Sequence, residues 1–60
     1  MPMSGKEMLK LFKQNGWVEL RQKWSHMIVG KNSERETIPL HKELKKGLEQ
    51  ALKKRLGIKI

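Results

Sequence analysis

The spacing of apolar residues changes twice along this chain, and that change constrains the fold more than any other feature. Apolar side chains first recur at intervals of three and four, as on one face of an α-helix, between Met8 and Phe12. They then alternate with polar residues, as in half-buried strands, between Trp17 and Leu40. The helical spacing returns from Leu44 onward. The sequence therefore predicts two helices with strands between them.

The first helix has a signal at each end. Ser4-Gly5-Lys6-Glu7 matches a capping box, in which the serine hydroxyl accepts an early helix N–H and the glutamate reaches back to the serine. Asn15-Gly16 ends the helix, because a glycine adopts the left-handed terminal conformation at no steric cost. We predict a helix over about residues 5–14, with Trp17 in the core beneath it and an apolar stripe of Met8, Leu9, Leu11 and Phe12.

Three strands are predicted next. In residues 17–23 we expect two faces, one with Val18 and Leu20 and the other with Glu19, Arg21 and Lys23. Residues 25–29 form the second strand, and Gly30-Lys31-Asn32-Ser33 has the composition of a turn.

The third strand covers residues 36–40, with Ile38 and Leu40 facing the same way. Pro39 has no N–H for a ladder, so this strand is an edge strand or ends there. The second helix carries Leu44, Leu48, Ala51, Leu52 and Leu56 at helical spacing.

Glycines limit the second helix. The helical pattern runs from Lys42 onward, but Gly47 weakens the first turn. The helix therefore begins either there or only at Lys46 or Gly47, with residues 41–45 then a loop, and Gly57 ends it. The order is then α-β-β-β-α. This is an α+β fold with both helices on one face of a three-stranded antiparallel sheet and the opposite face open.

Size and composition limit the kind of site. A chain of 60 residues forms one domain, residues 1–60, whose small core leaves little apolar area for a deep pocket. Any site is expected to be a shallow surface patch. With no cysteine, two histidines and no paired-carboxylate motif, we expect no metal and no cofactor. The apolar runs are only a few residues long, so we expect no membrane association and a cytoplasmic protein.

The charge indicates the class of partner. Fourteen Lys and Arg against six Asp and Glu give a formal net charge of +8. A field of this sign attracts polyanions, either nucleic acid or an acidic protein surface. Charge alone is equally typical of a small basic ribosome-associated protein, and it assigns no activity.

His26 is the candidate for chemistry, since it follows the cationic stretch Arg21-Gln22-Lys23-Trp24-Ser25. A proton-transfer group among phosphate-attracting charges is what a small metal-free ribonuclease needs. Taken alone, a histidine at this position is more often a half-exposed strand residue.

Five motifs in order resemble the HicA family of bacterial toxins: Ser4-Gly5-Lys6-Glu7, Asn15-Gly16-Trp17, Arg21-Gln22-Lys23-Trp24-Ser25-His26, Ile38-Pro39-Leu40-His41 and Glu43-Leu44-Lys45-Lys46-Gly47. The resemblance covers nearly the whole chain. It implies a fold like the double-stranded-RNA-binding domain and the activity of an endoribonuclease that cleaves mRNA, the toxin of a type II toxin–antitoxin system. The implied partners are a HicB-type antitoxin and mRNA.

The resemblance also implies roles for individual residues. The histidine and serine of the family's Gly-Ser-His motif fall on His26 and Ser25, which makes His26 the general base that deprotonates a ribose 2′-OH without a metal. Arg21, Lys23 and Lys31 would bind the substrate phosphate, and Trp24 and Ser25 are the other candidate substrate-binding residues. His41 is a candidate general acid if the sheet brings it near His26.

Trp24 stands where the family motif has glycine. Two interpretations follow: the indole stacks on an unpaired RNA base, or it obstructs the site and leaves a weak or inactive toxin. An engineered inactivating substitution is a further alternative. We favour impaired activity, because bulk at a former glycine more often disrupts function. The alternative from another class is a non-catalytic RNA-binding module of the same fold.

Overall fold

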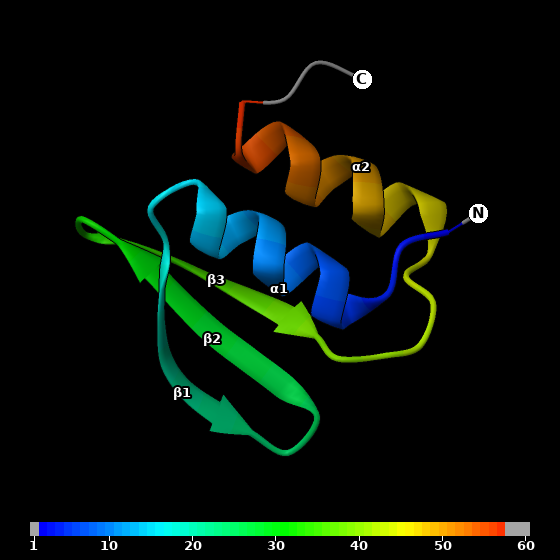
Figure 1. The fold of residues 1–60 in the computed structure, drawn as a ribbon, viewed down its shortest axis with the longest axis horizontal. Helices are drawn as coiled ribbons and strands as arrows, with labels where there is room; N and C mark the ends of the chain where they lie inside the picture. The colour runs from blue at the N-terminus through cyan, green and yellow to red at the C-terminus, as the bar shows by residue number, and fades with distance from the viewer. Residues whose placement is uncertain (1, 58–60) are drawn as a thin grey trace.

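A computed structural model of the chain describes residues 2–57 (Figure 1). Its elements are, in order, α1 (Gly5–Gln14), β1 (Val18–Lys23), β2 (His26–Lys31), β3 (Glu34–Pro39) and α2 (Lys46–Arg55). β2 lies in the middle of the sheet and pairs antiparallel with both neighbours. The predicted order and the bounds of the first helix are confirmed, and of the alternative starts of the second helix the structure has Lys46.

Both helices cover the same face of the sheet. Glu19, Val29 and Glu36 are cross-strand partners, so their side chains share one face, and Val29 is buried there. On that face Lys13 of α1 pairs with Glu19, and Arg55 of α2 pairs with Glu36. The layering predicted from the sequence is confirmed, and the face opposite the helices is called the open face below.

The core lies between the helices and strands β2 and β3. Phe12 and Trp17 meet edge to face, with ring centroids 5.1 Å apart, as expected for a tryptophan packed under the first helix. Leu40 is half-buried against the same cluster, on the side of Ile38. The buried set is Met8, Phe12, Trp17, Met27, Val29, Ile38, Leu44 and Leu52. Within residues 2–57 no helix has both the length and the hydropathy that crossing a bilayer requires.

The predicted alternation in β1 is wrong beyond Glu19. The pairing with β2 shifts by one residue between Glu19 and Arg21, which leaves Leu20 as a bulge. An extra residue reverses the alternation, so Arg21 lies on the open face whereas Glu19 faces the helices. Every residue of β1 is exposed, Val18 to 57% and Leu20 to 46%.

Gly30 lies within β2, although the sequence predicted a turn there. A Cβ at this position would come within 2.8 Å of the Leu20 side chain, so the glycine leaves space for the bulged leucine. The turn itself is Asn32-Ser33, and Asn32 has a φ of 57°, a conformation that asparagine tolerates well. The second and third strands are therefore longer on the turn side than predicted.

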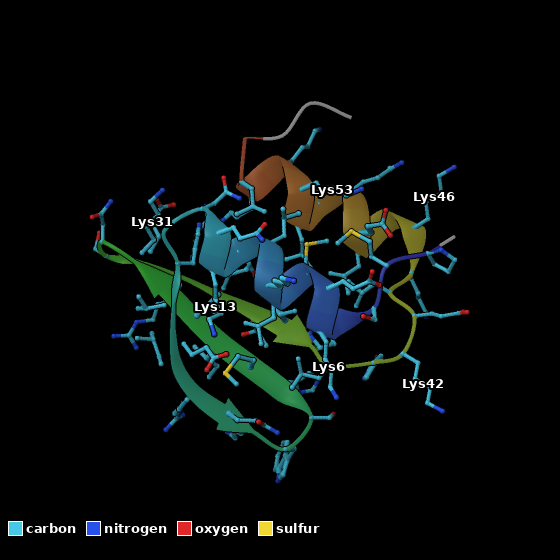
Figure 2. The ribbon with its side chains drawn as sticks, viewed as in Figure 1. Lys6, Lys13, Lys31, Lys42, Lys46 and Lys53 are labelled. Atoms are coloured by element: carbon cyan, nitrogen blue, oxygen red, sulfur yellow. The ribbon has the colours of Figure 1, made fainter. Side chains whose placement is uncertain are left out.

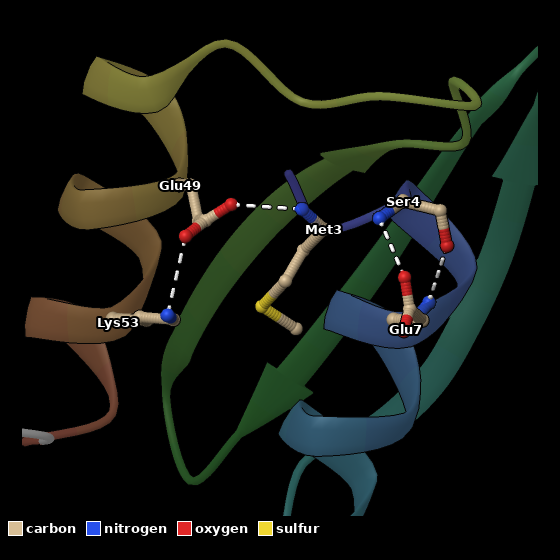
Figure 3. Close-up of polar contacts among 5 residues, drawn as sticks. All are labelled: Met3, Ser4, Glu7, Glu49 and Lys53. Atoms are coloured by element: carbon tan, nitrogen blue, oxygen red, sulfur yellow. Dashed lines mark hydrogen bonds and ion pairs between the residues drawn. The ribbon is translucent and has the colours of Figure 1, made fainter. Parts of the chain in front are cut away.

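The capping box of α1 is formed as predicted (Figure 3). The Glu7 backbone N–H donates to the Ser4 hydroxyl at 3.1 Å, and the Ser4 N–H donates to the Glu7 carboxylate at 2.9 Å. Gly16 follows the helix with a φ of 90°, and Gly57 follows α2 with a φ of 79°, so both predicted stops are confirmed.

Glu49 ties α2 to the segment before α1 (Figure 3). Its carboxylate accepts the Met3 backbone N–H at 3.0 Å and pairs with Lys53 at 3.2 Å. These contacts, the Met3 hydrogen bond first, hold the pKa of Glu49 below its usual value. The stabilisation that they give is present at neutral pH and is lost as the pH falls through that lowered pKa.

Gly5 lets the start of α1 lie directly against the chain that leaves β3. Its N–H donates to the His41 carbonyl at 2.8 Å. A Cβ at Gly5 would overlap the carbonyl oxygen of Pro39 and lie 2.6 Å from the Leu40 Cα. Since backbone atoms cannot move aside as a flexible side chain does, this contact requires glycine.

We expect Gly5→Ala to destabilise the protein by about 1–3 kcal/mol, because it overpacks a backbone contact. Gly47→Ala is the matched control, since nothing lies within 4 Å of a Cβ there. It should stabilise α2 by about 0.5–1 kcal/mol through helix propensity. Urea unfolding followed by circular dichroism measures both. Equal effects of the two substitutions would contradict the close contact at Gly5.

Candidate functional site

Two histidines meet at one end of the sheet. His26 is the first residue of β2, opposite Lys23 on β1 and Pro39 on β3. His41 lies in the segment that leaves β3. The centroids of the two imidazole rings are 6.1 Å apart, with the ring planes at 53°. His41 was a candidate general acid only if the sheet brought it near His26. The structure does place the two rings close together.

Backbone hydrogen bonds hold both histidines in place. The Leu40 N–H donates to the Ser25 carbonyl at 2.7 Å, which extends the pairing of β2 and β3 past the end of β3. On the other side, the His41 carbonyl accepts the Gly5 N–H of α1. His26 is half-buried and His41 is exposed, so both rings are within reach of a ligand at the surface.

A shallow depression of about 400 Å³ lies beside His41. It is lined by Ser4, Lys6, Leu40, His41 and Lys42. Figure 2 shows Lys6 and Lys42 on this side of the molecule. Sequence reasoning missed these two lysines, because only the close approach of α1 to the end of β3 brings them beside a histidine. Gly5, in the first turn of α1, was the one sign in the sequence that another segment packs closely there.

Trp24 occupies the turn between β1 and β2, a two-residue connection completed by Ser25. Its φ is 55°, in the left-handed region that a bulky residue rarely adopts. A hairpin turn of this kind favours glycine at the residue with positive φ. The geometry therefore gives a conformational reason for glycine at this position.

The indole of Trp24 points into solvent, with 81% of the residue exposed. The Lys23 Nζ lies 5.3 Å from the ring centroid, and the Trp24 carbonyl accepts a hydrogen bond from the Gln22 side chain at 2.9 Å. No core residue depends on this indole, so it is available for contact with a ligand.

The predicted phosphate-binding residues lie at different distances from His26. Lys23 is its direct cross-strand neighbour, and Arg21 follows farther along β1, opposite Ile28. Lys31 ends β2, so it lies at the other end of the strand, where its Nζ donates to the Asn15 carbonyl at 2.9 Å. Figure 2 shows Lys31 far from Lys6. The fold does not bring Lys31 together with the two histidines.

The carboxylates of the strands, Glu19, Glu34 and Glu36, lie on the helix side of the sheet. Arg55 pairs with Glu34 at 2.9 Å and with Glu36 at 3.3 Å, and Lys13 pairs with Glu19 at 3.4 Å. Over residues 2–57, neither Lys23 nor Arg21 forms an ion pair, and no cluster of three or more metal-ligating side chains is found. Lys23, the cross-strand neighbour of His26, therefore carries a positive charge that no ion pair neutralises within these residues.

The sequence and the fold of this chain both match known proteins. The family model described as the HicA toxin of bacterial toxin–antitoxin systems matches residues 5–58. The chain belongs to the HicA toxin family. No match was found among curated proteins. A chain in the solved structure of a toxin–antitoxin complex from Streptococcus pneumoniae is 41% identical, with a TM-score of 0.79, over 95% of this chain and 100% of that chain. The resemblance noted in the sequence is confirmed.

Two substitutions separate the turn strain at Trp24 from the indole. Glycine relieves the positive φ, whereas alanine keeps it and also removes the indole. We expect Trp24→Gly to be more stable than Trp24→Ala by about 1 kcal/mol. Thermal unfolding of the two variants of this HicA-family chain measures the difference. Equal stability would mean that the turn carries no such strain.

Proposed function

We propose that this HicA-family protein is a toxin that cleaves mRNA as a metal-independent endoribonuclease. The observation that carries the proposal is the pair of imidazoles, His26 and His41, with ring centroids 6.1 Å apart, beside Lys23, which forms no ion pair within residues 2–57. Histidine is the side chain most often used as a general base or general acid, so one ring can accept a proton while the other donates one. A shallow surface site also suits a polymer that cannot enter a deep pocket.

In the proposed reaction His26 accepts the proton of a ribose 2′-OH. The oxygen then attacks the adjacent phosphorus, and the bond from phosphorus to the 5′ oxygen breaks. Protonated His41 donates its proton to that leaving oxygen, which yields a 2′,3′-cyclic phosphate and a 5′-hydroxyl end. Each imidazole nitrogen must come within about 2.6–3.2 Å of the oxygen it serves.

Lys23 and Arg21 supply positive charge on the strand next to His26. Lys23 is the cross-strand neighbour of that histidine, so it is placed to stabilise the charge that develops on the phosphate. Ser25 contributes through its backbone, by pairing with Leu40 beside the histidines. We leave Lys31 out of the substrate site because it lies at the other end of β2.

Trp24 is proposed to contact an unpaired base of the RNA, in place of the impaired activity favoured from the sequence, because its indole projects into solvent. Its indole is exposed at the turn directly before Ser25 and His26, and every base offers a face on which an aromatic ring stacks. Trp24→Gly and Trp24→Ala should then both weaken RNA binding. If both variants instead cleave faster than the wild type, the indole obstructs the site.

We further propose a HicB-type antitoxin as the protein partner and the cytoplasm, where mRNA is translated, as the location. Similarity to a chain of a toxin–antitoxin complex supports the partner. Uncompensated cations near His26 would attract an acidic antitoxin surface as well as RNA. Binding there would neutralise the toxin by covering the histidines.

His26→Ala should lower cleavage of single-stranded RNA by 10²-fold or more, about the contribution of a general base, while RNA affinity changes little. The assay contains a chelator and is read on a gel. His41→Ala should also slow cleavage, and kcat/KM of the wild type should follow a bell-shaped pH profile, as an acid–base pair requires.

The same assay tests the rival function. A wild-type chain that binds RNA and yields no products would favour the non-catalytic RNA-binding module. Full activity of His26→Ala would refute the assigned base, and a profile with a single limb would refute His41 as the acid.

A further inference from the structure

The depression beside His41 has cationic side chains that the proposed reaction does not use. We infer that it is a phosphate-binding subsite for the RNA strand, which holds a phosphate next to the one being cleaved through Lys6 and Lys42. This inference rests on the proposed ribonuclease function, and it adds a part of the site that positions the strand. The depression is open and about 400 Å³ in volume, which is ample for a phosphate group.

The two lysines are available for an external anion. Lys6 and Lys42 are exposed and line the same depression, one from the first turn of α1 and the other from the loop after β3. Neither forms an ion pair with a carboxylate within residues 2–57. Glu7, the acid next to Lys6 along the chain, has its carboxylate directed to the Ser4 N–H (Figure 3).

The lysines, and not the helix terminus, carry the attraction for an anion. Three early amides of α1 already have partners inside the protein. The Gly5 N–H donates to the His41 carbonyl, the Glu7 N–H to the Ser4 hydroxyl and the Met8 N–H to the Ser4 carbonyl. The ammonium groups of Lys6 and Lys42 remain to bind an external anion. They attract a phosphate by their charge and make no base-specific contact.

The position of the depression selects RNA as its ligand over an acidic protein segment. His41 lines the depression, and its ring also faces the ring of His26. A strand whose scissile phosphate lies at the two histidines must continue on either side of them. The side of Lys6 and Lys42 is positively charged and hollowed, so the strand's next phosphate is placed there. Such a contact favours substrate binding without taking part in proton transfer.

The test compares two double substitutions of equal charge. Lys6→Gln with Lys42→Gln removes the proposed subsite. Lys10→Gln with Lys54→Gln is the control, because both lysines are exposed on helices and neither lines the depression. Both pairs are placed in the full chain carrying His26→Ala, so that a fluorescent single-stranded RNA stays intact while its anisotropy is measured at several salt concentrations.

We expect the subsite variant to bind RNA about fivefold more weakly than its parent at 0.1 M salt, with the slope of log K against log salt reduced by about 0.7, the value for one phosphate contact on a single strand. The control should change both quantities far less. Equal losses in the two double variants, or no loss in the subsite variant, would overturn the inference. If RNA affinity holds but binding of an acidic peptide falls, the depression serves a protein partner.

A kinetic measurement distinguishes this inference from the function on which it rests. With His26 intact, the subsite variant should raise KM about fivefold and leave kcat and its pH dependence unchanged. A fall in kcat with KM unchanged would overturn a positioning role. Absence of cleavage by the wild type would refute the ribonuclease, whereas the anisotropy comparison would still decide whether the lysines bind RNA phosphate.

Discussion

The contact between the start of α1 and the end of β3 is the constraint on which the rest of the site depends. Gly5 has no side chain, so its backbone reaches the Pro39 carbonyl and its N–H bonds to His41. That bond fixes the segment that carries His41, while the bond from Leu40 to Ser25 fixes it relative to His26. This small protein, which has no deep core, thus forms its site where the start of α1 meets the end of β3, and backbone hydrogen bonds hold the two segments together.

Separation of charge between the two sides of the sheet follows from the β-bulge. Without the bulge at Leu20, Arg21 and Lys23 would share a face with Glu19 and lie close to the acidic residues that α1 and α2 neutralise. With it, these cations lie on the open face together with His26. Exposed ion pairs such as Lys13–Glu19 contribute little to stability. Their placement on the helix side nevertheless keeps Glu19 and Glu36 away from Arg21 and Lys23, which form no ion pair within residues 2–57.

Most of the fold was predictable from local signals, and most of the site was not. The capping box at Ser4, the stop at Gly16 and the apolar periods each specify structure within a few residues. The bulge was not predictable, because it depends on Leu20 fitting over Gly30 in another strand. In the same way, His26 was recognisable beside its cationic stretch, whereas Lys6 joins the site only through a contact between residues far apart in sequence.

Trp24 illustrates why one substitution in a turn has two separable consequences. Positive φ at this residue costs free energy for any residue with a Cβ, and that cost belongs to the backbone of the hairpin. The exposed indole belongs to the surface, where it adds an aromatic face directly before His26. A glycine there would favour the turn and offer nothing to an RNA base. The tryptophan destabilises the turn and supplies an exposed aromatic face, so its effect on stability and its effect on RNA can be measured separately.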